Sequence, residues 1–183
     1  MDRPSERSAR AALDLARARP ATLGDGRLIC VDGPSGSGKT TLAEEIGAVE
    51  PSARVVHMDD LFEGWSGLPT VDAQLGGLLQ PLAAGEPGGY RRFDWVLDAY
   101  AEWVEVAPTP LLVLEGVGAG SLAVADLVTV LVWIEAPRDV RMSRGIERDG
   151  EAYAPYWEAW AVGEQAHFAE HRTRERADLV LTT

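Results

Sequence analysis

Residues 33–40, GPSGSGKT, match the pattern G-x-x-x-x-G-K-[ST] in full and decide the fold prediction for this chain. The apolar run before them, 27–32, predicts a buried strand, and residues 38–48 predict a helix. The three glycines let the backbone turn its N–H groups inward, where side chains would block a bound phosphate. A strand, this loop and a helix in that order predict a site for the phosphates of a nucleotide.

Lys39 is the only lysine in the chain, in which every other basic residue is an arginine. A compact ammonium group on a flexible stem reaches the β- and γ-phosphates of a nucleotide, whereas a planar guanidinium group fits this narrow place poorly. A Gly/Ser turn that binds nothing is the alternative, and the single lysine at the position that needs it argues against that alternative. The Thr40 hydroxyl is also expected to bind Mg²⁺. The residues of this segment expected to bind the nucleotide are Gly33, Pro34, Ser35, Gly36, Ser37, Gly38, Lys39, Thr40 and Thr41.

With 183 residues, of which 46% are hydrophobic, the chain can bury the core of one domain, and we expect a single domain over 1–183. The net charge of −12 argues against nucleic acid and an anionic membrane as partners, because both need a basic surface. Cys30 is the only cysteine, which excludes an internal disulfide and fits a cytoplasmic protein. No apolar stretch approaches the ~18 residues that span a bilayer. Whether the chain forms a homodimer is left open.

Short runs rich in Val, Ile and Leu alternate with longer segments of helical pattern. The strands are expected at 27–32, 54–58, 111–115, 129–134 and 178–182. The helices are expected at 5–18, within a leading segment 1–22, and at 38–48, 70–84, 96–106, 137–148 and 156–175, with loops at 63–69 and 85–90. Because the strands are apolar on both faces, they predict a doubly wound α/β fold, with a mainly parallel five-stranded sheet and helices on both faces. The ligand of such a fold lies beyond the carboxyl ends of the strands.

Acidic residues follow two of the expected strands. Asp59 and Asp60 come directly after the second strand, at the edge of the sheet that holds the phosphate-binding loop. A kinase needs a carboxylate to accept the proton of the acceptor hydroxyl, although either residue could instead cap the following turn. Glu115 ends the third strand, where an acid can hold Mg²⁺ directly or through water, or cap the loop that follows. A surface or packing role, without a metal, is expected for His57, His167 and His171.

Residues 137–149, PRDVRMSRGIERD, carry arginines three and four residues apart, so that a helix would align Arg141, Arg144 and Arg148 along one side. A solvated face paired to acids is one interpretation. The other is a lid over 137–155, whose guanidinium groups neutralise the charge that spreads over a transferring phosphoryl group. In that case Arg141 and Arg144 are expected to be catalytic, and Arg148 is expected to bind the nucleotide.

Five motifs in this order resemble the uridine kinase branch of the P-loop kinases, which also contains phosphoribulokinase and pantothenate kinase. They are GPSGSGKTT (33–41), HMDDLF (57–62), LEGV (114–117), DVRMSRGIERD (139–149) and TRERADLVL (173–181). The first motif is common to many NTPases, and the combination is more specific. The resemblance implies a phosphotransferase that uses ATP and Mg²⁺ and phosphorylates a hydroxyl group of a small acceptor. It implies that Asp59 is the base, with Asp60 as its less favoured substitute, and that Glu115 lies near the metal ion.

In this family the acceptor site lies between the second strand and an insertion, which corresponds here to 62–103. That region departs from uridine kinase itself, and its residues could bind the acceptor or form a structural loop. The residues considered for substrate binding are Asp59, Asp60, Trp65, Tyr90, Arg91, Arg92, Asp94 and Glu115. A nucleoside-like acceptor is favoured; a nucleoside monophosphate clamped by Arg91 and Arg92, or an antibiotic or other secondary metabolite, is the alternative. An ATP-binding regulatory switch without such an acceptor is the alternative from another class.

Overall fold

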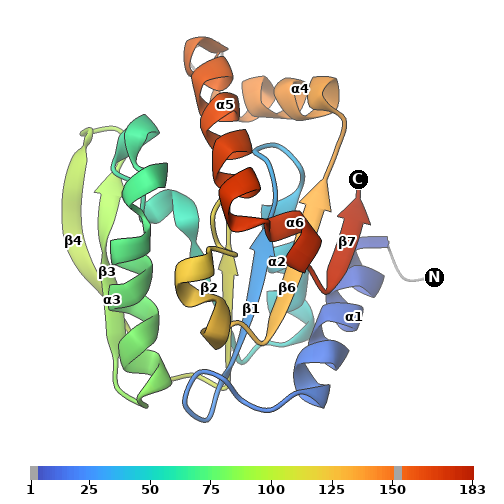
Figure 1. Ribbon diagram of the computed structural model, residues 1–183, viewed down its shortest axis with the longest axis vertical. Helices are drawn as coiled ribbons and strands as arrows, with labels where there is room; N and C mark the ends of the chain where they lie inside the picture. Colours follow the sequence, from blue (N-terminus) through green and yellow to red (C-terminus); the bar gives the residue numbers. More distant parts are fainter. Residues whose placement is uncertain (1–3, 151–153) are drawn as a thin grey trace.

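The computed structural model describes residues 4–150 and 154–183, without the side chains of Pro4, Arg148, Asp149 and Ala154. Five parallel strands form a sheet in the order β2-β5-β1-β6-β7 (Figure 1). The strands are β1 (Arg27–Asp32), β2 (Ala53–His57), β5 (Leu111–Glu115), β6 (Val130–Glu135) and β7 (Leu179–Thr182). Since every pairing in this sheet is parallel, all five strands end at the same edge. The predicted five-stranded doubly wound sheet is therefore confirmed.

Helices cover both faces of the sheet (Figure 1). On one face lie α1 (Pro4–Ala18) and α2 (Lys39–Val49), and on the other lie α3 (Asp72–Ala83) and α5 (Ala154–His171). Strand β1 serves both layers because its side chains alternate: Leu28 and Cys30 pack toward α3, and Ile29 and Val31 pack toward α2. Because the sheet is covered on both faces, the sequence of a central strand such as β1 is a continuous apolar run.

Two further helices come from the C-terminal part of the chain. Helix α4 (Arg138–Asp149) begins just after β6, and α6 (Thr173–Arg176) follows α5 after Arg172, whose φ of 49° interrupts the helix. The long helix expected at 156–175 is therefore two helices. Short 3₁₀ segments complete the described elements: η1 (Met58–Asp60), η2 (Gly64–Ser66), η3 (Leu68–Thr70) and η4 (Leu122–Leu127).

A separate hairpin corrects one part of the sequence prediction. Residues 96–106 are not a helix, and 85–90 is not all loop, because β3 (Gly88–Asp94) and β4 (Ala99–Val106) pair antiparallel and pack on α3. The turn is closed by the Asp94 carboxylate, which accepts hydrogen bonds from the backbone N–H groups of Val96 and Leu97, each at 3.0 Å. Such a carboxylate favours a turn at the point where the helix was expected to begin.

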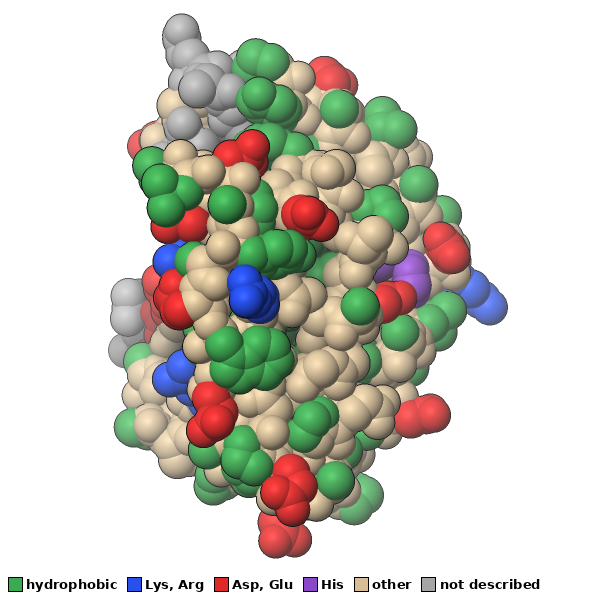
Figure 2. All heavy atoms as spheres, turned by 90° about the vertical axis from the view of Figure 1, so that its left-hand side faces the viewer, with side chains coloured by type: hydrophobic (Ala, Val, Ile, Leu, Met, Phe, Trp, Pro, Cys, Tyr) green, Lys and Arg blue, Asp and Glu red, His purple; other side chains and the backbone are tan. Residues whose placement is uncertain are grey.

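The hairpin side of the molecule is shown in Figure 2, where acidic side chains are spread between apolar ones. Its exposed apolar side chains include Val96, Leu97 and Trp103. Among the described residues, none of the helices is both long enough and apolar enough to cross a lipid bilayer.

Candidate active site

The loop between β1 and α2 passes so close to neighbouring backbone that a side chain at either of two glycines would displace that backbone. Gly33 has a φ of 142°, and a Cβ atom there would lie 2.0 Å from the carbonyl oxygen of Ile134. Gly36 has a φ of 77°, and its Cβ would lie 2.4 Å from the carbonyl oxygen of Arg141. Both values lie in the region that favours glycine. The loop is thus pressed between the end of β6 and α4.

The inner side of this loop has the features of a phosphate site. Helix α2 starts after Gly38, and no described side chain caps its first N–H groups, which leaves them for an anion. The Lys39 Nζ atom donates a hydrogen bond to the carbonyl oxygen of Pro34 at 3.1 Å, so the ammonium group spans the loop. These groups fit the phosphates of a nucleotide.

Thr40 and Glu115 bring two oxygen ligands together beside the loop. Thr40 Oγ1 donates a hydrogen bond to Glu115 Oε1 at 3.2 Å, and the Glu115 side chain is buried. No group of three or more Asp, Glu, His or Cys side chains able to hold a metal occurs in the described part of the chain. Mg²⁺ is commonly bound by only one or two protein oxygens, together with water and substrate phosphates. The Thr40 and Glu115 pair therefore fits Mg²⁺ bound with a nucleotide.

His57 also contacts Glu115, which the sequence analysis did not anticipate. Its Nδ1 atom lies 2.5 Å from Glu115 Oε1, and this hydrogen bond raises the pKa of His57 despite partial burial. The His57 side chain is 42% exposed, as a surface position implies, and it also lines a cavity at this site. A signal was present in the sequence, since His57 stands two residues before Asp59, at the edge of the sheet where ligands bind.

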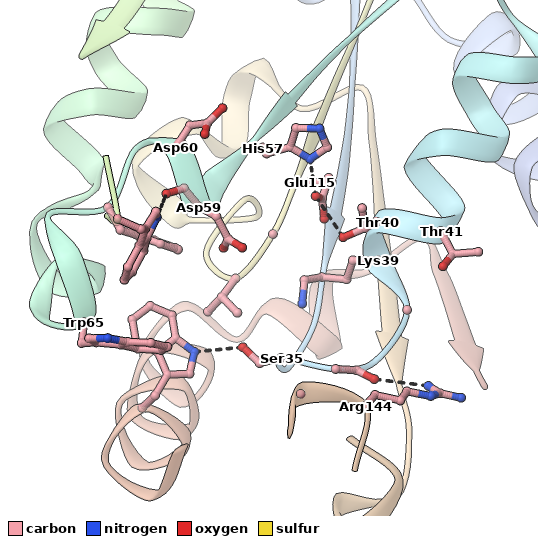
Figure 3. A pocket seen from close by; sticks show the side chains of 18 of the residues that line it. Ser35, Lys39, Thr40, Thr41, His57, Asp59, Asp60, Trp65, Glu115 and Arg144 are labelled. Atoms are coloured by element: carbon pink, nitrogen blue, oxygen red, sulfur yellow. Dashed lines mark hydrogen bonds and ion pairs between the residues drawn. The ribbon is translucent and has the colours of Figure 1, made fainter. Parts of the chain in front are cut away.

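A cavity of about 790 Å³ opens above the loop. Asp59 and Lys39 both face it, from the end of β2 and the start of α2 respectively (Figure 3). Asp59 is exposed, whereas Asp60 is partly buried, which raises its pKa, and it forms a hydrogen bond with Tyr90. The other predicted residues that line the cavity are Ser35, Gly36, Gly38, Thr40, Thr41, Asp60, Trp65, Glu115 and Arg144. Gly33, Pro34 and Ser37 belong to the same loop but do not line the cavity.

Aromatic rings form the wall opposite the loop. Trp65 stacks on Tyr156, with ring centroids 5.1 Å apart and planes 3° apart, and its edge meets Trp95 and Trp160. The Trp95 Nε1 atom donates a hydrogen bond to the backbone oxygen of Asp59 at 2.8 Å. Because Trp95 is fixed to the backbone of Asp59, the ring wall and this carboxylate keep a defined relative position.

Four residues predicted to bind the acceptor lie away from this cavity, on β3. Arg92 is paired with Glu102 and Asp94, and Asp94 closes the hairpin turn. The Arg91 backbone is bound by the Gln74 side chain, and Tyr90 is buried against Asp60. The structure therefore does not bring Tyr90, Arg91, Arg92 and Asp94 together with the phosphate loop.

The arginines of α4 divide into two groups. Arg144 lines the cavity and donates from Nη1 to the carbonyl oxygen of Gly36 at 3.2 Å and to Thr183 Oγ1 at 2.9 Å. Arg141 does not line the cavity: its side chain is 12% exposed and donates from Nη1 to the carbonyl oxygen of Ser35 at 3.1 Å. The position predicted for Arg141, over a transferring phosphoryl group, differs from this one because α4 packs directly on the loop. The side chain of Arg148 lies outside the described residues.

A glycine-rich loop that joins the first strand of a parallel sheet to a helix, with a lysine at the helix start and an acid at the end of the adjacent strand, defines the fold of a P-loop NTPase of the kinase type. No family model matches the chain. A curated uridine kinase from Borrelia turicatae (strain 91E135) is 26% identical over 176 residues, which cover 85% of each protein. A uridine kinase from Borrelia hermsii (strain HS1 / DAH) is 25% identical over 176 residues, with the same coverage.

Solved structures agree with this fold. One described as a possible uridine kinase from Bacillus stearothermophilus superposes with a TM-score of 0.62 at 23% identity, and covers 95% of this chain and 99% of its own. Another, proposed to be a fructose transport system kinase from Silicibacter sp. TM1040, gives a TM-score of 0.63 at 21% identity over the whole of both chains. The resemblance to uridine kinase-like P-loop kinases is thus confirmed, and it supports a phosphotransferase.

Proposed function

We propose that the protein is an ATP- and Mg²⁺-dependent kinase that transfers the γ-phosphoryl group of ATP to a hydroxyl group of a small, neutral, nucleoside-like acceptor. The observation that carries the proposal is that Lys39 and Asp59 face one cavity, with the phosphate loop on one side and a wall of aromatic rings on the other. Phosphoryl transfer needs this division, because the phosphates and the acceptor hydroxyl must approach from opposite sides.

In the proposed reaction, Asp59 accepts the proton of the acceptor hydroxyl. The acceptor oxygen forms a bond to the γ-phosphorus, the bond from this phosphorus to the bridging oxygen of ATP breaks, and ADP leaves. Lys39 and Arg144 stabilise the negative charge that spreads over the phosphate oxygens. Thr40 and Glu115 would hold Mg²⁺, which supplies further positive charge at the phosphates. The exposed Asp59 carboxylate faces the cavity, whereas the Asp60 carboxylate is already hydrogen-bonded to Tyr90, which makes Asp60 the poorer candidate.

A neutral acceptor is favoured over a nucleoside monophosphate. A second phosphate group would need a cation on the acceptor side, and Arg91 and Arg92 do not line the cavity. Planar bases stack on aromatic side chains such as Trp65 and Trp95, which supports a nucleoside. The curated relatives are named uridine kinases, which supports the same class.

The proposal treats 1–183 as one kinase domain, with 62–103 as the acceptor-binding insertion and 137–155 as a lid. The described parts of these segments support this division, because Trp65 and Trp95 from the first and Arg144 from the second reach one cavity. The cytoplasmic location stays a prediction, and the question of a homodimer stays open.

The test is acceptor-dependent ADP release by the purified protein with ATP and Mg²⁺. The panel should contain nucleosides, nucleoside monophosphates, pantothenate, sugars and hydroxylated antibiotics, with Asp59→Asn and Asp60→Asn as a matched pair. We expect release with a nucleoside, its loss in Asp59→Asn by a factor of about 100 or more, and a smaller loss in Asp60→Asn. Binding of ATP without stimulation by any acceptor would instead favour the regulatory-switch interpretation.

A further inference from the structure

All three polar groups of Ser35 are held by side chains from α4 and α5. The Ser35 N–H donates to Glu164 Oε1 at 2.8 Å, and its carbonyl oxygen accepts from Arg141 Nη1 at 3.1 Å. Its hydroxyl oxygen accepts from Trp160 Nε1 at 2.9 Å. Ser35 is thus a residue of the phosphate loop whose orientation is set from outside that loop.

Glu164 connects these contacts. Its side chain is 3% exposed, and its Oε1 atom accepts hydrogen bonds both from Ser35 N–H and from Trp160 Nε1, the latter at 2.7 Å. Its Oε2 atom lies 3.8 Å from Arg141 Nη1. One carboxylate oxygen therefore holds the loop and the indole, and the other faces the guanidinium group. A buried carboxylate requires such partners, because burial of an unpaired charge is costly.

We propose that Glu164 is a positioning residue, which fixes the backbone of Ser35 and thereby keeps the phosphate loop in the shape that binds ATP. This inference rests on the proposed function. Glu164 does not line the cavity, so it acts through Ser35 and not by contact with a substrate.

Substitutions of Glu164 can test its hydrogen bonds separately from its charge. Glu164→Gln keeps an oxygen acceptor for Ser35 N–H and Trp160, whereas Glu164→Leu has a similar volume, removes the acceptor of the Ser35 N–H and leaves Trp160 Nε1 with the Ser35 hydroxyl oxygen alone. Removal of a partner from a buried donor costs more than the net value of a hydrogen bond. Glu158→Leu is the matched control on the same helix: Glu158 also pairs with an arginine of α4, at 2.6 Å, but its side chain is 64% exposed.

The decisive measurement is calorimetric titration with Mg·ATP, which needs no acceptor. We expect Kd to rise about tenfold or more in Glu164→Leu, to stay within about threefold of wild type in Glu164→Gln, and to be unchanged in Glu158→Leu. In turnover, KM for ATP should rise in Glu164→Leu while KM for the acceptor stays the same. Unchanged Kd in a folded Glu164→Leu variant, or equal losses in the Gln and Leu variants, would overturn the proposal.

If Glu164→Leu fails to fold, Glu164→Met decides the question, because its unbranched side chain fills the space of glutamate and also removes the acceptor of the Ser35 N–H. A several-fold weaker Kd for Mg·ATP is expected there, and a wild-type Kd would overturn the proposal. Failure of the proposed function is distinguishable. The expected order of Kd values without acceptor-dependent ADP release would remove phosphotransfer and keep Glu164 as a positioning residue. Acceptor-dependent ADP release by wild type, with an unchanged Kd for Mg·ATP in the Glu164 variants, would keep the kinase function and overturn the role of Glu164. A wild-type protein that does not bind Mg·ATP would overturn both proposals.

Discussion

Nδ1 of His57 lies 2.5 Å from Oε1 of Glu115, and the two residues are register partners at the carboxyl ends of the adjacent strands β2 and β5. Glu115 Oε1 also accepts from Thr40, so a single carboxylate oxygen joins three elements of the site. The contact with His57 orients Glu115, the acid that would hold Mg²⁺ beside Lys39 and Asp59. A metal-binding carboxylate depends on such neighbouring hydrogen bonds for its orientation.

The His57–Glu115 contact predicts a pH-dependent contribution to stability. The Glu115 hydrogen bond raises the pKa of His57 above the value of about 6.5 in an unfolded chain. The contribution is therefore fully present below about pH 6.5 and is lost as the pH rises through the folded pKa. We expect His57→Gln to lower the free energy of unfolding by less than about 1 kcal/mol, because the ring is partly exposed. Urea unfolding at pH 5.5 and pH 9 should show the larger difference at pH 5.5; equal differences would contradict the assignment.

Lys39→Arg tests the geometric reason for the single lysine. The ammonium group lies within the loop, bonded to the carbonyl oxygen of Pro34, and the Lys39 side chain is buried. A planar guanidinium group keeps the charge but does not fit this space, so Kd for Mg·ATP should rise about tenfold or more. Titration calorimetry measures this, with thermal unfolding as the check on folding. A wild-type Kd for Mg·ATP in Lys39→Arg would show that a positive charge at this position is enough for binding, whatever the shape of the side chain.

Trp65→Leu tests the aromatic wall as the acceptor site. Removal of a ring that stacks on a substrate should raise KM for the acceptor several-fold, since aromatic pairs contribute about 0.5–1.5 kcal/mol. KM for ATP should not change. Trp103→Leu is the control, because Trp103 lies exposed on β4 and does not line the cavity. Equal effects of the two substitutions on KM for the acceptor would remove Trp65 from acceptor binding.

The phosphate loop and the parallel sheet could be predicted because their signals are local. Gly33, Gly36 and Lys39 stand in one continuous motif, and each strand is an apolar run that needs no knowledge of its partner. The β3–β4 hairpin was missed because residues 99–106 form a strand only through pairing with β3, which itself packs on α3. Tertiary pairing decided between strand and helix there.

The contacts that hold the phosphate loop from α4 and α5 could not be predicted, for a related reason. Trp157, Trp160 and Glu164 lie three and four residues apart, so a helix puts them on one face, and all three are buried. An acid on an apolar helical face signals a buried partner, but the sequence does not say that this partner is the Ser35 N–H, 129 positions away. Likewise, the spacing of Arg141 and Arg144 predicted a shared face but not that one packs on the loop and the other lines the cavity.

The pair of stacked histidines on α5 predicts acid sensitivity. The rings of His167 and His171 are stacked with centroids 4.0 Å apart, and His167 is buried. Burial, together with His171, lowers the pKa of His167 to about 4, although Asp72 opposes this. In the unfolded chain His167 titrates near pH 6.5, so between about pH 6.5 and 4 the unfolded state binds more protons than the folded state. The contribution of neutral His167 is therefore present above pH 6.5 and lost as the pH falls.

The measurement is the free energy of unfolding in urea from pH 7 to pH 4 for wild type and His167→Gln, a neutral side chain of similar size. Carboxylates titrate in both proteins, so the difference between the two curves isolates His167. In wild type, the extra slope attributable to His167 should approach about 1.4 kcal/mol per pH unit within the window, because one additional proton is taken up on unfolding. In His167→Gln this extra slope should disappear, since glutamine does not titrate. Parallel curves for the two proteins would show that His167 titrates normally in the folded protein and that its burial does not exclude the imidazolium form.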